Sequence, residues 1–178
     1  MLCPFSEGDE AKDFFEEHKN DYRVCSKELI TDDSYKAYDI CHLHFWPVVN
    51  SSSPLCEKDS IGIEDFAGYT VLSENMYRPN VRHLMALFEE KGIKVKLKEA
   101  YDKVRMGKLI SVDPNSVYFA YGSECVQLKQ TYGDAITVLK NEPINTLTIV
   151  LQSRSGDVDE KLIKLLLDRL KNYENEFL

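Results

Sequence analysis

The sequence predicts an α/β fold, because segments patterned like strands alternate with segments patterned like helices along the chain. Two neighbouring segments show the contrast. Residues 78–92 carry apolar side chains at helical spacing, whereas residues 93–99 alternate apolar and charged side chains as a half-buried strand does. The alternation of strands with helices along the chain favours largely parallel sheets. A chain of 178 residues can bury one sizeable core or two small lobes.

One helix and two strands are predicted before the serine link at residues 51–53. Residues 6–22 begin with Ser6, which suits a helix cap, and carry acidic side chains in their first turn. Residues 23–30 and 38–49 are rich in β-branched and aromatic side chains, as strands are. The polar residues 31–37 join these two strands as a turn.

The middle of the chain contains the clearest predicted helix. Residues 60–66 suit a short helical turn and residues 68–72 a brief apolar strand. Pro79 suits the first turn of the helix in 78–92, and Gly92 suits its end.

The last part of the chain adds strands and an amphipathic helix. Residues 100–110 predict a short helix that ends near Gly107. The remaining strands are predicted at 116–122, 135–140 and 145–152. Residues 157–174 predict a final helix, with Asp157 and Glu160 as a capping box. Its leucines predict a broad buried face: Leu162, Leu165, Leu166 and Leu170.

Composition excludes several classes of protein. A formal net charge of -8 argues against a chain that itself grips a nucleic-acid backbone. Five scattered cysteines without a CxxC motif do not suit a disulfide framework or a zinc knuckle. The chain shows no signal peptide or membrane-spanning run, so we expect a soluble, cytoplasmic protein. We expect no metal and no cofactor. Hydrolase, P-loop and dinucleotide-binding motifs are absent from the sequence, so we do not expect an enzyme.

Two loops are candidate binding sites because each follows a predicted strand. The loop SENMYRPN also precedes a helix, where unpaired backbone amides can hold an anion. Its candidate residues are Ser73, Asn75, Tyr77 and Arg78. Tyr121 and Ser123 occupy the corresponding loop YGSE. In the alternative interpretation, both loops are ordinary caps and turns.

The strand in 38–49 carries histidines that could bind a metal or a ligand. Strand alternation places His42 and His44 on one face and Cys41 on the other, which excludes a metal site formed by all three. His44 is the better candidate for a hydrogen bond to a ligand.

A longer segment resembles a known family. After the apolar strand, the sequence contains a serine link, Pro54 and Leu55, and then IGIEDFAG at 61–68 before the next strand. This order is similar to the effector-binding domain of LysR-type transcriptional regulators, and the similarity extends over about residues 36–175. The resemblance implies the two-lobed fold of type 2 periplasmic binding proteins, with two inter-lobe crossings.

The resemblance also implies a domain layout. The first lobe would comprise 1–51 and 147–178, shortened relative to the family, and the second 52–146. A small polar effector with an anionic group would bind between the lobes, with Ser6, Thr31 and His44 among its contacts. As alternatives, Ser6 is only a helix cap and Thr31 only a turn residue. We expect a homodimer, and DNA binding only through a helix-turn-helix domain that this chain lacks.

The expected function is therefore a ligand-sensing regulatory domain. Two alternatives remain open. One is a degenerate oligomerisation module that no longer binds ligand, which the shortened first lobe suggests. The other is an enzyme on the same scaffold, since a fold does not fix a function.

Overall fold

A computed structural model describes residues 22–27, 30, 36–140, 144–153 and 160–175. The described chain divides into two compact units, with boundaries between Leu43 and His44 and between Thr146 and Leu147. The residues between these boundaries form the second unit, and those on either side form the first. The predicted helix at 6–22, apart from Tyr22 in the first strand, lies outside the described residues, as do Ser6, Thr31 and the proposed cap Asp157.

The strands form a single sheet with the order β1-β7-β2-β5-β3-β4, and β6 also pairs with β2. They are β1 (Tyr22–Ser26), β2 (Lys36–Asn50), β3 (Thr70–Ser73), β4 (Lys96–Glu99), β5 (Ser116–Tyr121), β6 (Ile136–Val138) and β7 (Asn145–Ser153). Strands β2 and β7 each have residues in both units, so the chain passes between the units twice.

The helices are mostly in the second unit. They are α2 (Pro79–Glu90), α3 (Lys103–Val112), α4 (Gly122–Tyr132) and α5 (Glu160–Asn175), with short 3-10 turns η2 (Pro54–Glu57), η3 (Ile63–Phe66) and η4 (Gly133–Ala135). Among the described residues, no helix is long and apolar enough to cross a membrane.

The prediction of a largely parallel sheet is wrong. Strands β4, β3 and β5 are parallel, and each is joined to the next by a helix. By contrast, β2 is antiparallel to β5 and β6, and β1 is antiparallel to β7. The helices α2 and α3 return the chain to the start of the next strand, which is the crossover that parallel pairing of β3, β4 and β5 requires.

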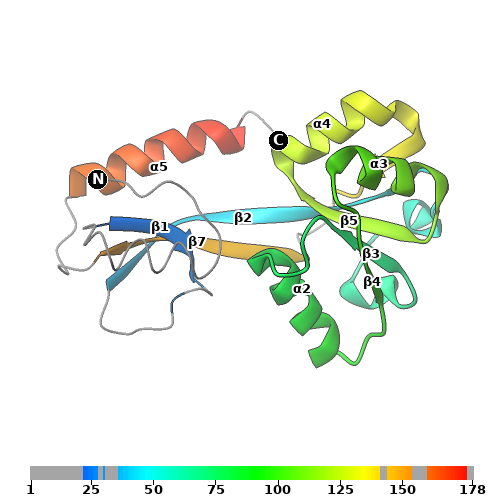
Figure 1. The fold of residues 1–178 in the computed structure, drawn as a ribbon. Helices are drawn as coiled ribbons and strands as arrows, with labels where there is room; N and C mark the ends of the chain where they lie inside the picture. The colour runs from blue at the N-terminus through cyan, green and yellow to red at the C-terminus, as the bar shows by residue number, and fades with distance from the viewer. Residues whose placement is uncertain (1–21, 28–29, 31–35, 141–143, 154–159, 176–178) are drawn as a thin grey trace. The chain divides into compact units, whose positions relative to one another are not determined.

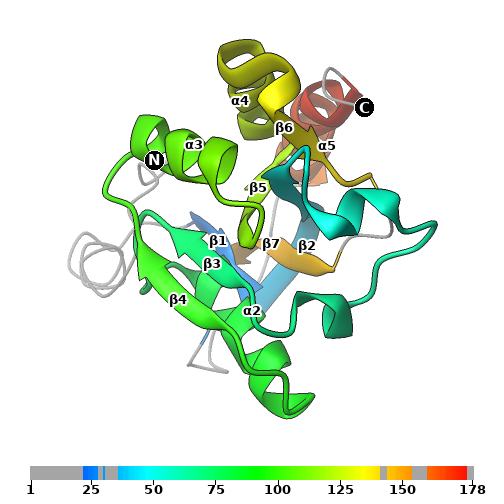
Figure 2. The same ribbon diagram turned by 90° about the vertical axis from the view of Figure 1, so that its right-hand side faces the viewer.

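Helices cover both faces of the sheet in the second unit, with α3 and α4 on one face and α2 on the other (Figures 1 and 2). The side chains of β5 alternate accordingly. Tyr118 and Ala120 join the core beneath α3 and α4, whereas the Phe119 ring lies 6.4 Å from Phe88 of α2. This alternation gives the parallel strands a core on each side.

Helix α2 begins and ends as its sequence predicts. Pro79 occupies the first helical position, where its missing amide hydrogen costs nothing. Gly92 has a positive φ of 67°, which a glycine adopts without strain.

The helix predicted to end near Gly107 instead continues to Val112, with Gly107 buried inside it. A Cβ atom at Gly107 would lie 2.1 Å from Cε2 of Tyr132, so glycine allows α3 to pack closely against the end of α4. Helix α4 itself was not predicted from the sequence.

The first unit contains β1, parts of β2 and β7, and α5. The expectation of a broad buried leucine face on α5 is wrong at Leu165, which is 57% exposed. Leu162 and Leu166 are half-buried, and the side chain of Leu170 lies outside those that the structure describes. Apolar residues occupy a wider arc of this helix than one packing surface can cover, so those at its margin face solvent.

The serine link lies within the second unit, beyond the boundary in β2, and the predicted lobe boundary at 51/52 therefore falls inside that unit. Asn50 organises the link, because its side-chain oxygen accepts hydrogen bonds from the amide and the hydroxyl of Ser52, at 2.8 and 2.6 Å. The Ser53 hydroxyl hydrogen-bonds the Tyr69 hydroxyl at 3.0 Å. These polar residues close a turn that leads from β2 to η2.

Candidate functional site

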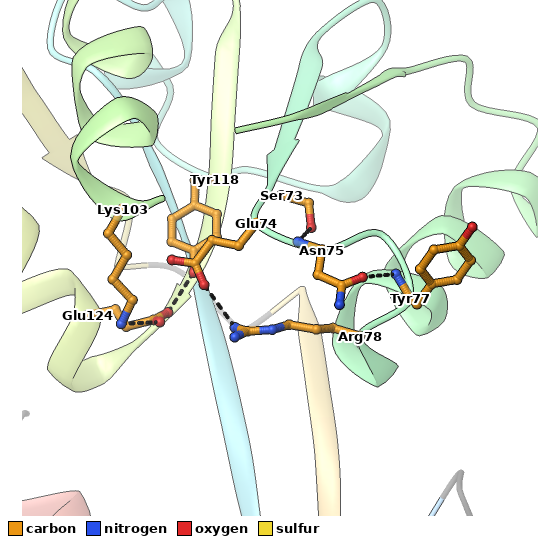
Figure 3. Close-up of polar contacts among 8 residues, drawn as sticks. All are labelled: Ser73, Glu74, Asn75, Tyr77, Arg78, Lys103, Tyr118 and Glu124. Carbon is orange, nitrogen blue, oxygen red and sulfur yellow. Dashed lines mark hydrogen bonds and ion pairs between the residues drawn. The ribbon is translucent and has the colours of Figure 1, made fainter. Parts of the chain in front are cut away.

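The candidate site lies at the carboxyl edge of the three parallel strands in the second unit. Strands β3, β4 and β5 end at Ser73, Glu99 and Tyr121, and each continues into a helix. Carboxyl ends of parallel strands meet at one edge, so the loops before α2, α3 and α4 emerge side by side. This edge carries most of the polar side chains discussed below (Figure 3).

The loop after β3 is held by its own polar side chains. The buried Ser73 hydroxyl accepts a hydrogen bond from the Asn75 amide at 3.1 Å. The Asn75 side-chain oxygen then accepts one from the Tyr77 amide at 2.8 Å. Ser73 and Asn75 therefore order the loop, and Tyr77 itself is 77% exposed.

Arg78 is the N-cap residue of α2 and forms an ion pair with Glu74. Its Nη1 atom lies 3.3 Å from Oε2 of Glu74. Figure 3 shows the guanidinium directed back toward the strand ends rather than along α2. Arg78 is thus placed at the candidate site, and Glu74 partly balances its charge.

A second ion pair joins α3 to α4. Lys103 Nζ lies 2.9 Å from Oε1 of Glu124, and the Tyr118 hydroxyl donates to Oε2 of the same carboxylate at 2.8 Å. Asp102 accepts the Arg105 amide as the cap of α3, which places Lys103 in the first helical position. Glu124 lies in the first turn of α4, where the helix dipole favours a negative charge.

Burial makes this second pair important for the unit. Glu124 is 2% exposed, and a buried carboxylate is tolerated only when charges and hydrogen bonds compensate for lost hydration. Partial burial disfavours the charge on Lys103, but the hydrogen bond and charge of Glu124 outweigh it and raise the Lys103 pKa. Burial, together with Glu124, also raises the pKa of Tyr118, so its hydroxyl remains a donor.

The two pairs present their cations to solvent and their carboxylates to the protein. The side chains of Lys103 and Glu124 are 42% and 3% exposed, and those of Arg78 and Glu74 are 33% and 15% exposed. An incoming anion would therefore meet an ammonium and a guanidinium group before either carboxylate. Both cations can hold a carboxylate or phosphate group through charge-assisted hydrogen bonds.

The last residue of β5 contributes an aromatic side chain. Tyr121 is the residue before α4, is 37% exposed, and its ring centroid lies 5.9 Å from Lys103 Nζ. Ser123 is half-buried in the first turn of the same helix. Tyr121 thus lies beside a site cation, and Ser123 is next to Glu124 in the chain.

His44 is exposed on β2, where its Nδ1 atom hydrogen-bonds the Thr146 hydroxyl at 3.1 Å. His42 makes the equivalent contact with Thr148 at 3.2 Å. The described contacts of His44 are thus with β7 and with the ring of Trp46, at 6.4 Å, and not with the paired charges at the strand ends.

Four residues at this edge were not among the sequence-based candidates: Glu74, Lys103, Tyr118 and Glu124. Glu74 and Glu124 lie inside the two loops that the sequence singled out, so their charge was a usable signal. Lys103 and Tyr118 had no local signal, because only the packing of α3 against α4 brings them to Glu124. Within the described ranges, no cluster of His, Cys, Asp or Glu side chains could hold a metal ion.

This arrangement of helix-linked parallel strands and two strands shared between units defines a two-lobed fold of the type 2 periplasmic-binding-protein-like class, as the sequence predicts. The sequence matches no protein-family model and no curated protein. Solved structures, in contrast, resemble the chain over most of its length, and regulatory or effector-binding domains of LysR-family regulators are among them.

Three solved structures illustrate the similarity. The effector-binding domain of a BenM variant is 19% identical, with a TM-score of 0.68 over 96% of this chain and 81% of that one. The regulatory domain of CcmR from Synechocystis PCC6803 is 12% identical, with a TM-score of 0.64 over 93% of this chain and 78% of that one. Full-length OxyR from Pseudomonas aeruginosa is 12% identical, with a TM-score of 0.63 over 88% of this chain and 54% of that one. The chain therefore has the fold of LysR-family effector-binding domains.

Proposed function

We propose that the chain is a ligand-sensing regulatory domain of a LysR-type transcriptional regulator. Its effector is small, polar and anionic, and binds at the carboxyl edge of β3, β4 and β5. The effector shifts the regulator between states only to the extent that it binds one state more tightly than the other.

The observation that carries this proposal is the orientation of the two ion pairs. Lys103 and Arg78 lie on the solvent side, and each is held in place by a less exposed carboxylate. The net charge of -8 disfavours anions at long range, but screening by salt weakens distant charges before it weakens contacts. The more exposed Lys103 and Arg78 therefore act on an anion at the site more strongly than the distant acidic surface does, although Glu124 and Glu74 balance their formal charges.

The fold comparison supports a small ligand. One of the similar structures, the CcmR regulatory domain, is described in complex with 2-PG. A related fold can therefore hold a small molecule, and in this chain the paired cations are the groups suited to hold one.

The test is calorimetric titration with a panel of small carboxylates and phosphates. Removal of one charge-assisted hydrogen bond should weaken the best anion about tenfold or more in Lys103→Ala and in Arg78→Ala. Lys108→Ala is the matched control, because Lys108 is an exposed lysine on the same helix α3 beyond its first turn. This control should change the affinity less than about twofold.

Two results would contradict the proposal. One is a best ligand that is a cation. The other is an anion whose affinity is equal in the wild type and in both site variants, since such an anion would bind elsewhere.

A second candidate is the degenerate module that associates without ligand. The observation in its favour is that the two cations already have carboxylate partners within the unit. Indifference to the whole panel, combined with concentration-dependent association of the chain, would favour this candidate.

A further inference from the structure

The first unit contains a buried arginine whose charge no described residue balances. Arg23 lies in β1 and is 7% exposed, and it is the only buried lysine or arginine among the described residues. Within those residues, no side chain forms a hydrogen bond or an ion pair with its guanidinium. The cation four residues further on is arranged differently. Lys27 has a side chain that is 55% exposed, and its Nζ atom lies 3.0 Å from Oδ1 of Asp39.

Burial of an unbalanced charge is unfavourable, because the charged group loses its hydration and gains nothing in return. Arginine is therefore almost never buried in folded proteins unless it is paired. The other charged residue that is buried in the described part of the chain follows this rule. Glu124 has both the ammonium of Lys103 and the hydroxyl of Tyr118 as partners. Arg23 has no comparable partner there, so its burial calls for a negative group from elsewhere.

The residue opposite Arg23 offers further hydrogen-bond donors. Gln152 of β7 is the cross-strand partner of Arg23 in the antiparallel pair of β1 and β7 (Figure 1), so the two side chains share a face of the sheet, with Cβ atoms about 5 Å apart. Gln152 is 4% exposed, and its Oε1 atom accepts a hydrogen bond from the Cys25 thiol at 3.9 Å. No described residue accepts a hydrogen bond from its Nε2 atom. The guanidinium and the amide thus both present N–H groups that lack a described acceptor.

We infer that Arg23 and Gln152 form a binding site for a small oxyanion, a carboxylate or a phosphate, in the first unit. The planar guanidinium matches two oxygens of such a group, and the amide of Gln152 can donate to another. Both residues belong to the first unit, whereas the carboxyl edge of β3, β4 and β5 belongs to the second. The inference is therefore independent of the proposed function.

Differential scanning calorimetry of the whole chain in sodium phosphate, sodium acetate and sodium chloride at equal ionic strength tests the inference. The better-bound oxyanion, at ten times its dissociation constant, should raise the melting temperature by about 3 °C. Arg23→Met keeps an apolar stem and removes the charge, so it should abolish this shift and melt no lower than the wild type in chloride. Arg82→Met is the matched control, because it removes an exposed arginine of α2, and it should keep the shift.

A second measurement follows Arg23 directly. In isotopically labelled protein, the nuclear magnetic resonance signal of the Arg23 Nε–H group is the one that disappears in Arg23→Met. This signal should move as the oxyanion is added and should saturate. The same movement should persist in Lys103→Ala, which lacks a cation of the candidate site in the second unit.

Three results would overturn the inference. One is a wild type that melts at the same temperature in all three salts, with an Arg23 signal that does not move. Another is an Arg23→Met variant that melts below the wild type in chloride, since the arginine would then already have an anionic partner within the chain. The third is a shift that Lys103→Ala loses and Arg23→Met keeps. In that case the anion binds at the carboxyl edge of β3, β4 and β5, so the inference fails while the proposed function stands.

Discussion

Replacement of Gly107 by alanine should destabilise the protein, although alanine is the better helix former. The new Cβ atom would lie 2.1, 2.6 and 2.8 Å from three ring atoms of Tyr132, whereas ordinary contacts begin near 3.4 Å. Overpacking this severe costs about 3 kcal/mol, at the upper end of the usual range. Removal of a helical glycine returns about 1 kcal/mol, so the net loss is about 2 kcal/mol.

The same substitution should become stabilising when the obstructing ring is removed. In a Tyr132→Ala background, Gly107→Ala keeps only the gain of about 1 kcal/mol in helix propensity. The coupling between the two positions is therefore about 3 kcal/mol. The effect of Gly107→Ala on stability changes sign between the two backgrounds, which distinguishes a clash with Tyr132 from a general effect on α3. In the wild-type background, the melting temperature should fall by about 4–8 °C.

Urea unfolding of the four proteins, followed by tryptophan fluorescence, provides the measurement. Trp46 is the single tryptophan and packs against the core cluster that Tyr132 also contacts, so its emission reports this unit. Equal destabilisation by Gly107→Ala in both backgrounds would refute the reasoning. So would a stabilising effect in the wild type.

Three further predictions concern acid stability, thiol chemistry and assembly. Hydrogen bonds from Ser116 and from the Asn115 amide hold the Asp113 pKa below its ordinary value, so their contribution is present above about pH 4 and lost as the pH falls further. Asp113→Ala should therefore cost about 1 kcal/mol at pH 7, and urea titrations should show this difference shrinking below pH 4; a constant difference would contradict the assignment. Burial and Glu124 raise the pKa of the Cys125 thiol to about 12. At pH 8 only about one thiol in ten thousand is ionised, so mass spectrometry should find Cys125 unmodified by Ellman's reagent until the protein unfolds; labelling as fast as that of half-buried Cys56 would be unexpected. We also propose a homodimer with α2 in its interface; Ala86→Arg should weaken it in sedimentation equilibrium, and a wild type that is monomeric at high micromolar concentration would exclude it.

The sequence predicts the elements whose signals are local. Pro79 and Gly92 mark the ends of α2, β-branched and aromatic residues mark β2, and period-two alternation marks β4, so these elements lie where they were expected. Gly107 misled the prediction because its role is not local: it admits the ring of Tyr132, a residue far along the chain. Helix α4 carries only a weak apolar pattern, and tertiary packing rather than amphipathicity specifies it.

The same distinction applies to the site. Arg78 and Tyr121 were identifiable because they end or follow strands, and strand ends are where α/β folds place ligands. Lys103 was not identifiable, because its role depends on Glu124 of another helix. His44 stays a prediction; its Nδ1 atom hydrogen-bonds the Thr146 hydroxyl.

The separation of stability from recognition in the second unit has a consequence for protein engineering. The fully buried apolar side chains lie on strands and helices, such as Val117 and Ile110, whereas Arg78, Lys103 and Tyr121 lie at strand ends or helix starts at one rim. Loops tolerate substitution better than the scaffold that holds them. If the effector binds at this rim as proposed, randomising a few positions there while keeping Glu124 should therefore yield sensors with new ligand preferences and an unchanged core. The same freedom would let natural relatives diverge in ligand while their folds remain superimposable.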